Sequence, residues 1–247
     1  MAQNESGAPR LAVFGATSAI AEQVARIYAA RGANIFLAGR QQARLDTIAR
    51  DLEVRGAKSV ATYAIDFDDV AAFGPMLDAC GTPVRALIAY GTLPVQADVE
   101  RDPQAAAKSL HTNFNSPAIL LNGLAERLQP GAAIAVITSV AGERGRQSNY
   151  VYGAAKGGLS RFVEGLRHRL APQNIRVIDV RPGFVDTPMT DGIEKGGPLW
   201  AKPERVARDI ERALEKRNGA IHTPWFWGVI MAIITRVPAR IFHKTKL

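Results

Sequence analysis

Three side chains whose types and spacing suit proton transfer lie in the second half of the chain: Ser139, Tyr152 and Lys156. Tyr152 and Lys156 are four residues apart in the run YVYGAAKGG, so on a helix they share one face. A free tyrosine hydroxyl has a pKa of about 10, and a nearby ammonium favours the phenolate and lowers that value. A serine hydroxyl beside them could hold a carbonyl or alcohol oxygen. The triplet therefore predicts an acid/base device that interconverts C=O and CH–OH, although a Tyr–Lys pair alone is more often a surface pair.

The chain that must position these residues alternates short β-rich runs with longer helical patterns. This alternation predicts a single-domain α/β fold of the Rossmann type, a doubly wound parallel sheet of about seven strands that binds ligands at the carboxyl ends of its strands. The expected strands are Leu11–Phe14, Asn34–Ala38, Ser59–Ala64, Ala86–Tyr90, Ala133–Thr138, Ile175–Val180 and Ala220–His222. The expected helices span 19–31, 41–55, 69–80, 103–128, 151–171 and 203–217, and 184–202 is expected to be a long loop over the site.

No domain boundary interrupts this pattern. We therefore expect residues 1–223 to form the dinucleotide-binding and catalytic domain, with 224–247 as an apolar and basic C-terminal arm of the same domain. Cys80 is the only cysteine, so there is no disulfide framework, and the four histidines have no metal-ligand spacing; we assign no metal. The polar start MAQNESGAPR predicts no secretory signal, and a cytoplasmic location is expected.

The chain is basic, with a formal charge of +8 and a pI of 9.9. A positive net charge of this kind is compatible with binding to nucleic acid, to an anionic membrane or to an anionic substrate, but many proteins are simply basic. Here the basic residues are spread along the chain and aromatic residues are few, so nucleic-acid binding is not expected.

The turn after the first strand has small residues and opens a helix, as a pyrophosphate-binding turn would. It reads Gly15-Ala16-Thr17-Ser18-Ala19-Ile20-Ala21. A dinucleotide motif would have glycine at 15, 19 and 21, so Ala19 and Ala21 depart from it, while Thr17 and Ser18 can offer hydroxyls to phosphate. A tight turn without a ligand is the alternative.

The second strand ends at Arg40, where an acidic side chain would bind the adenosine ribose hydroxyls. Arg40 could instead pair with a 2′-phosphate, which favours NADP(H) and leaves NAD(H) open. Asp66 and Phe67 follow the third strand and could bracket the adenine. Ala89, Tyr90 and Gly91 follow the fourth and would lie along the cofactor.

Taken in order, these residues resemble the short-chain dehydrogenase/reductase superfamily over essentially the whole chain. The matching positions are Gly15 to Ala21, Asp66, Ala89-Tyr90-Gly91 in place of the usual Asn-Ala-Gly, Asn113, Ser139, Tyr152, Lys156, Pro182-Gly183, Val185 and Thr187. The resemblance implies that Tyr152 is the general acid in reduction, that Ser139 orients the substrate oxygen, and that Lys156 binds the nicotinamide ribose. It also implies that Asn113 helps to hold a water of the proton relay, and that Thr187 and the Val185 backbone hold the carboxamide.

Two segments, 141–159 and 222–247, resemble decaprenylphosphoryl-2-keto-ribose reductases. That resemblance implies a polyprenylphosphoryl 2-keto-pentose substrate, formed by a flavin oxidase partner, in the epimerisation of a lipid-linked ribose to arabinose. The tail has about a dozen apolar residues, too few to span a bilayer, followed by Arg236, Arg240, Lys244 and Lys246. Peripheral contact with anionic lipid at the inner membrane face would suit it, and so would packing on its own domain or in a homodimer or homotetramer.

Arg144 and Arg146 lie between Ser139 and Tyr152, where they could meet a substrate phosphate or form a plain surface pair. The sequence thus predicts an NADP(H)-preferring carbonyl reductase. A soluble reductase of a small ketone or a 3-oxoacyl thioester is the alternative enzyme, and a dinucleotide-binding redox sensor is the alternative outside enzymes.

Overall fold

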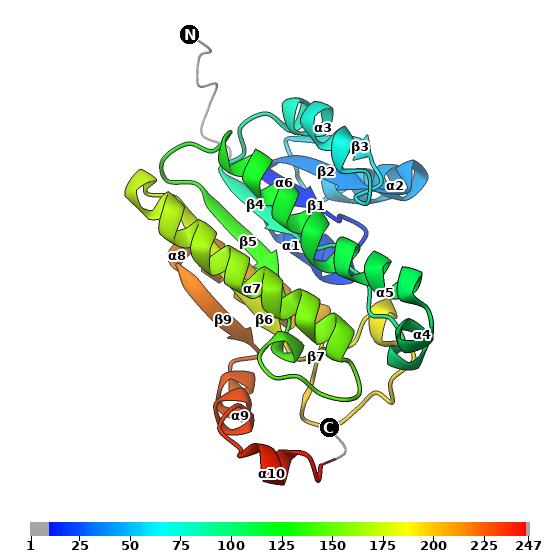
Figure 1. Ribbon diagram of the computed structural model, residues 1–247. Helices are drawn as coiled ribbons and strands as arrows, with labels where there is room; N and C mark the ends of the chain where they lie inside the picture. The colour runs from blue at the N-terminus through cyan, green and yellow to red at the C-terminus, as the bar shows by residue number, and fades with distance from the viewer. Residues whose placement is uncertain (1–9, 246–247) are drawn as a thin grey trace.

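The structure, a computed structural model, describes residues 10–245 (Figure 1). The residues 1–9, on which the expectation about a signal sequence depends, and Lys246 of the basic tail lie outside the described residues.

Seven parallel strands form the central sheet, in the order β3-β2-β1-β4-β5-β6-β9. Their bounds are β1 (Arg10–Phe14), β2 (Asn34–Gly39), β3 (Ser59–Ala64), β4 (Arg85–Ile88), β5 (Ala133–Ile137), β6 (Arg176–Pro182) and β9 (Gly219–Thr223). The inner strands are nearly continuous apolar runs because helices cover both of their faces. The strand order reverses between β1 and β4, which is the switch point where such sheets bind ligands. The predicted fold class is confirmed.

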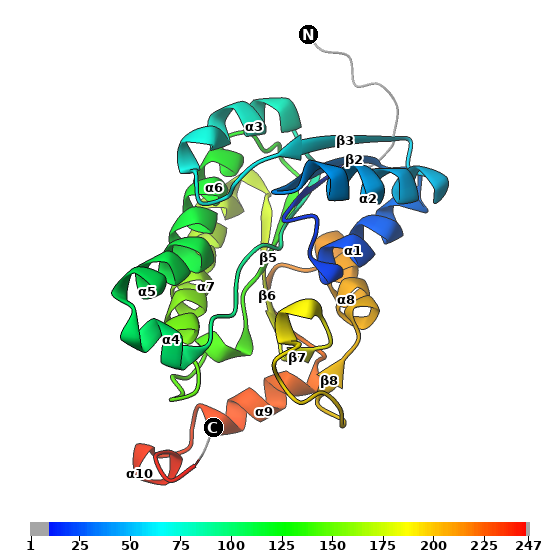
Figure 2. The same cartoon turned by 90° about the vertical axis from the view of Figure 1, so that its right-hand side faces the viewer.

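Helices cover the two faces of the sheet (Figure 2). One layer contains α1 (Ala19–Ala29), α2 (Gln42–Val54) and α8 (Pro203–Lys216); the other contains α3 (Phe73–Cys80), α4 (Gln96–Arg101), α5 (Pro103–Leu110), α6 (Ser116–Ala125) and α7 (Tyr150–Leu170). Successive strand residues point to opposite faces, so Val13 joins the first core and Phe14 the second. These two apolar cores hold the carboxyl edge of the sheet in place.

The single helix expected over 103–128 is wrong. It is divided into α5, a π-helical segment η2 (His111–Asn115) and α6. Pro117 supplies no N–H and would clash with the carbonyl four residues earlier, so a regular α-helix cannot continue through this stretch. Single π-helical turns often lie at functional sites, and this one contains Asn113.

The loop expected over 184–202 is folded back on itself, because β7 (Phe184–Val185) pairs in parallel with β8 (Trp200–Ala201). The remaining short turns are η1 (Val70–Ala72), η3 (Val140–Gly142), η4 (Ala171–Gln173) and η5 (Pro188–Thr190).

The C-terminal arm is helical and consists of α9 (Phe226–Ile234) and α10 (Ala239–Phe242). Both views show it beyond the carboxyl ends of β5, β6 and β9 (Figures 1 and 2). Trp227, Met231 and Phe242 of the arm are buried, and the first two pack with Val140 of the domain. Across residues 10–245, no helix has the length and apolar character needed to cross a bilayer.

Candidate active site

Ser139, Tyr152 and Lys156 meet at the carboxyl end of β5. Ser139 follows that strand, and the other two lie on α7, at its first and second turns. The Ser139 side chain lies close to Tyr152 and favours a lower pKa of its hydroxyl. Lys156 Nζ donates to the carbonyl of Ile137 over 3.1 Å and lies 5.9 Å from the centroid of the Tyr152 ring. The three groups predicted from spacing are therefore brought together.

Burial dominates the protonation of the pair. It raises the pKa of Tyr152 to about 12, although Ser139 opposes this rise. It lowers the pKa of Lys156 to about 8, against the attraction of the Asp179 carboxylate. The pKa of Tyr152 is therefore raised and not lowered as the sequence led us to expect, because desolvation of the phenol outweighs the opposing effect of Ser139. A tyrosine that keeps its proton suits donation to a substrate oxygen.

Asn113 positions the strand end at Gly91 through its side-chain amide, and its part in holding a water stays a prediction. Its Nδ2 donates to the carbonyls of Thr92 and Ser109, each at 3.0 Å, and its Oδ1 accepts from the Thr92 amide at 3.1 Å. A Cβ on Gly91 would lie 2.7 Å from Asn113 Oδ1 and 3.2 Å from Lys156 Nζ. Only glycine lets the chain pass this close to the lysine.

Asp179 is a site residue that our sequence reasoning missed. It is 1% exposed on β6 and accepts hydrogen bonds from Thr138 at 2.5 Å, Ser160 at 2.6 Å and Arg181 at 2.8 Å. These contacts join the end of β5 to α7, the two elements that carry the catalytic triplet. A lone acid within the apolar strand run RVIDVRP is the signal that could have identified it.

At the nucleotide end, Gly15 adopts a φ of 90°, and a Cβ there would lie 2.6 Å from the Tyr90 amide nitrogen. The amides of Gly15 and Ala16 both donate to the Ala38 carbonyl at 2.9 Å, which binds the turn to the end of β2. The Ser18 side chain makes no capping bond, so the first N–H groups of α1, starting at Ala19, remain directed out of the helix end. Thr17 and Ile20 flank this same turn.

The side chains beyond β2, β3 and β4 have different surroundings. Arg40 is exposed and has no hydrogen-bond or ion-pair partner within residues 10–245. Asp66 Oδ1 accepts from the Asp68 amide at 3.1 Å. The Phe67 ring is buried and stacks on the Tyr90 ring at 4.0 Å. That ring therefore belongs to the core, and the prediction that Asp66 and Phe67 bracket the adenine stays a prediction.

The segment after β6 lies at the carboxyl edge of the sheet, as the catalytic residues do. The Gly183 amide donates to the Thr223 carbonyl at 3.2 Å, next to Pro182, and Val185 is buried. The carbonyls of Val185 and Thr187 accept from the Thr190 hydroxyl at 2.8 and 2.9 Å. Ala89 follows β4, and its amide donates to the Phe14 carbonyl at 2.8 Å.

Arg144 and Arg146 contact the C-terminal arm. Arg144 Nη1 donates to the carbonyls of Ile234 and Thr235, and its guanidinium lies 4.0 Å from the Phe242 ring centroid. Arg146 Nη2 lies 3.3 Å from Met231 Sδ. Their predicted contact with a substrate phosphate stays a prediction.

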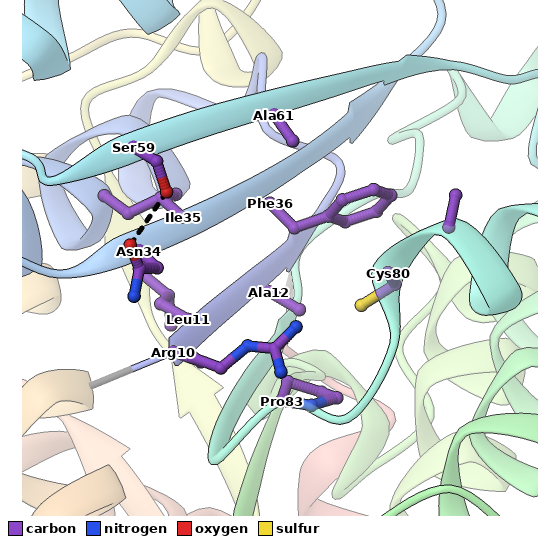
Figure 3. A pocket seen from close by; sticks show the side chains of 11 residues that line it. Arg10, Leu11, Ala12, Asn34, Ile35, Phe36, Ser59, Ala61, Cys80 and Pro83 are labelled. Carbon is purple, nitrogen blue, oxygen red and sulfur yellow. Dashed lines mark hydrogen bonds between the residues drawn. The ribbon is translucent and has the colours of Figure 1, made fainter. Parts of the chain in front are cut away.

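A small hollow of about 120 Å³ lies at the amino ends of β1, β2 and β3 (Figure 3). Arg10, Asn34 and Ser59, the first residues of these strands, line it, and Ser59 donates to Asn34 at 2.8 Å. It lies at the opposite edge of the sheet from Tyr152 and has no part in the site.

Comparison with known proteins identifies this arrangement. The sequence pattern of short chain dehydrogenases matches residues 10–197. The chain belongs to the short chain dehydrogenase family. An uncharacterised oxidoreductase from Mycobacterium tuberculosis is 35% identical to it, over 98% of each chain.

Solved structures of other proteins share the fold. A putative dehydrogenase from Burkholderia cenocepacia, with bound NADP, gives a TM-score of 0.80 at 16% identity, covering 87% of this chain and 92% of that one. A 3-oxoacyl-[acyl-carrier protein] reductase from Brucella melitensis, in complex with NAD, gives 0.79 at 21% identity, covering 91% and 99%. The chain is an oxidoreductase of this family, acting on CH–OH and C=O groups.

Proposed function

We propose that this short chain dehydrogenase is a carbonyl reductase that prefers NADP(H) and uses Tyr152 as its general acid. The observation that carries the proposal is the meeting of Ser139, Tyr152 and Lys156 at the carboxyl edge, beside Gly91. The residues present fit a dinucleotide, because the Gly15 turn and the Gly91 strand end leave no room for a Cβ and the Ser18 side chain does not cap α1.

When bound, the nicotinamide dinucleotide supplies the hydride. The Tyr152 hydroxyl donates its proton to the substrate oxygen, and Ser139 donates a second hydrogen bond that stabilises the developing alkoxide. Lys156 Nζ donates one hydrogen bond to the Ile137 carbonyl and has further N–H donors for the ribose hydroxyls. Thr187 and the Val185 backbone would hold the carboxamide.

Tyr152→Phe tests the mechanism, with NADPH affinity measured alongside turnover. We expect turnover of ketones to fall at least about a hundredfold, in line with the loss of a general acid, while the Kd for NADPH stays within about twofold. Turnover at the wild-type rate would contradict the role of Tyr152. NADPH binding without turnover of any ketone by the wild-type protein would favour a redox sensor.

The cofactor preference rests on Arg40, an exposed cation without a partner in the described chain. The 2′-phosphate of NADP(H) would be a partner for this guanidinium, because it would accept charge-assisted hydrogen bonds from it. Titration at fixed salt should give tighter binding of NADPH than NADH, and Arg40→Ala should remove the difference. Equal Kd values for NADPH and NADH in the wild-type protein would contradict this assignment but would not affect the proposed reductase function.

For the substrate we propose a polyprenylphosphoryl 2-keto-pentose, delivered by a flavin oxidase, on the resemblance of 141–159 and 222–247. Arg144 of the first segment contacts the end of α9 in the second, and this contact supports a substrate-binding surface formed by both segments. Comparison of kcat/KM for a prenylphosphoryl keto-pentose with that for acetoacetyl thioester and simple ketones separates this proposal from the small-ketone and 3-oxoacyl alternatives. We also propose a homodimer or homotetramer, which sedimentation would measure.

We further propose that the arm meets anionic lipid on the cytoplasmic face of the membrane. Trp225, the residue directly before α9, and Val229 and Ile233 on that helix are spaced four residues apart and are 69%, 55% and 63% exposed. Arg236, Arg240 and Lys244 follow, and 216–247 contains no acidic residue.

Flotation with vesicles of phosphatidylcholine, with and without phosphatidylglycerol, tests this contact. We expect salt-sensitive binding to the anionic vesicles that Ile233→Ser weakens and Val54→Ser, an exposed residue of α2, does not. Self-association through the same face, with no vesicle binding, would contradict it.

A further inference from the structure

Residues 183–187 follow β6 and lie outside the seven-stranded sheet. Within this segment, Phe184 and Val185 of β7 form a separate two-stranded sheet with Trp200 and Ala201 of β8. A two-stranded unit is at best marginally stable by itself in water. Contacts with other parts of the molecule must therefore fix this segment at the carboxyl edge, where the catalytic residues lie.

The two faces of β7 are covered by different parts of the molecule. Val185 is buried in the first apolar core. Phe184, the neighbouring residue, points to the opposite face and packs against the buried cluster that contains Trp227 and Val140. The ring centroids of Phe184 and Trp227 are 5.4 Å apart, in an edge-to-face arrangement. The C-terminal arm therefore covers the face of β7 that the first core does not.

The indole of Trp227 lies directly on the backbone at Gly183. A Cβ at that position would lie 1.9 Å from both Nε1 and Cε2 of the ring. The φ of Gly183 is outside the left-handed region, so the close approach of the ring, and not the backbone conformation, requires glycine here. The Gly183 amide donates to the Thr223 carbonyl at 3.2 Å, and the Trp227 amide donates to the neighbouring Pro224 carbonyl at 3.1 Å.

Packing fixes the Trp227 ring in this place. The side chain is 4% exposed, and its Nε1 has no acceptor among residues 10–245. The cluster around the ring includes Val140, the residue that directly follows Ser139. This cluster therefore links the segment after Ser139 with residues 183–187.

We propose that Trp227 is a positioning residue for the nicotinamide end of the cofactor and acts through residues 183–187. The indole sets the place of the Gly183 backbone, and so the place of Val185 and Thr187, which would hold the carboxamide. This inference rests on the proposed reductase function and deepens it, because it gives the C-terminal arm a part in cofactor geometry.

The test is calorimetric titration with NADPH and with adenosine 2′,5′-bisphosphate, which has the 2′-phosphate of the cofactor but no nicotinamide. Trp227→Ala should weaken NADPH binding by about tenfold, the cost of about one hydrogen bond to the carboxamide, and leave the Kd for the bisphosphate within about twofold. Trp227→Phe keeps a flat ring beside Gly183 and should stay within about threefold of the wild-type Kd for NADPH.

Met231→Ala is the matched control. Met231 is 1% exposed and lies in the same cluster, one turn further along α9, so its truncation should lower Tm while the indole stays on Gly183. The Kd of this variant for NADPH should remain within about twofold of the wild-type value. Amide hydrogen exchange in residues 183–187 of the cofactor-free protein should be faster in Trp227→Ala than in Met231→Ala.

Gly183→Ala tests the same contact without a change in the arm, and it applies even where Trp227→Ala does not fold. The added Cβ would displace the ring, so we expect about a tenfold loss of NADPH affinity in the otherwise wild-type protein. In Trp227→Ala, where the ring is absent, the same substitution should add a loss of less than about threefold.

Equal losses of NADPH affinity in Trp227→Ala and Met231→Ala, or equal exchange rates in residues 183–187, would overturn the inference. So would an equal loss of affinity for NADPH and the bisphosphate in Trp227→Ala, because that pattern indicates general damage to the fold. Failure of the wild-type protein to bind NADPH is a separate result, since it would overturn the proposed function. The exchange comparison uses no cofactor and still reports whether the indole holds residues 183–187.

Discussion

Asp179→Asn is the most informative perturbation of the scaffold beneath the catalytic residues. The wild-type carboxylate accepts from Thr138 through Oδ1, and from Ser160 and Arg181 through Oδ2. Asparagine keeps the shape and one acceptor but replaces the other oxygen with a donor, and it removes the charge that Arg181 faces at 2.8 Å.

The magnitude follows from this burial. Removing one partner of a buried, hydrogen-bonded ion pair costs about 3–5 kcal/mol. Two features favour the lower end of that range. Arg181 is 20% exposed and also lies 3.4 Å from Glu143, and the Thr138 hydroxyl can donate to the Val180 carbonyl instead. We expect a loss of about 3 kcal/mol, which for a domain of this size lowers Tm by roughly 6–12 °C.

The assay is thermal unfolding followed by circular dichroism, with Asp186→Asn as the matched control. Asp186 is 54% exposed and pairs with Lys195, so its loss should cost at most about 1 kcal/mol. Because Asp179 raises the pKa of Lys156, the alkaline limb of the pH–rate profile should also move to lower pH in Asp179→Asn. A Tm equal to that of Asp186→Asn, with an unchanged pH profile, would refute the reasoning.

Two further predictions concern the site itself. Gly91→Ala should lower turnover at least about a hundredfold, because its Cβ would meet Asn113 and Lys156. Gly145→Ala is the control: Gly145 has open space around it, so turnover should stay within about twofold of the wild-type value. Similar losses of turnover in both variants would argue against a close approach at Gly91. Lys156 has a pKa lowered from 10.5 to about 8, so the unfolded chain binds more protons between these values, and stability rises with pH. Relative to Lys156→Met, the wild-type free energy of unfolding in urea should therefore increase by up to about 3 kcal/mol from pH 8 to 10.5, and a constant difference would show that burial does not depress this pKa.

The strands and the main helices could be predicted from the sequence because their signals are local. Apolar runs such as Ala133–Ile137 and turn residues such as Gly15 identify elements within a few positions. The parallel sheet follows from the alternation of strands and helices. Tyr152 and Lys156 could be paired because four residues on a helix define a shared face, and Ser139 followed from its place at a strand end.

Other features depend on contacts between distant segments, and the sequence alone could not decide them. Phe67 stacks on Tyr90 in the core, and Arg144 caps α9, some 90 residues away. The pKa of Tyr152 depends on how completely the fold removes the phenol from water, which no local pattern reports.

The division has a physical cause. Backbone preference, periodicity and side-chain spacing act over a few residues, so the sequence by itself determined the order of elements, the family and the residues of the catalytic triplet. Burial and hydrogen-bond partners depend on which surfaces meet after folding. Only the tertiary structure therefore decided that Asp179 joins β5 to α7 and that Trp227 of the arm lies against Gly183, beside the carbonyl site.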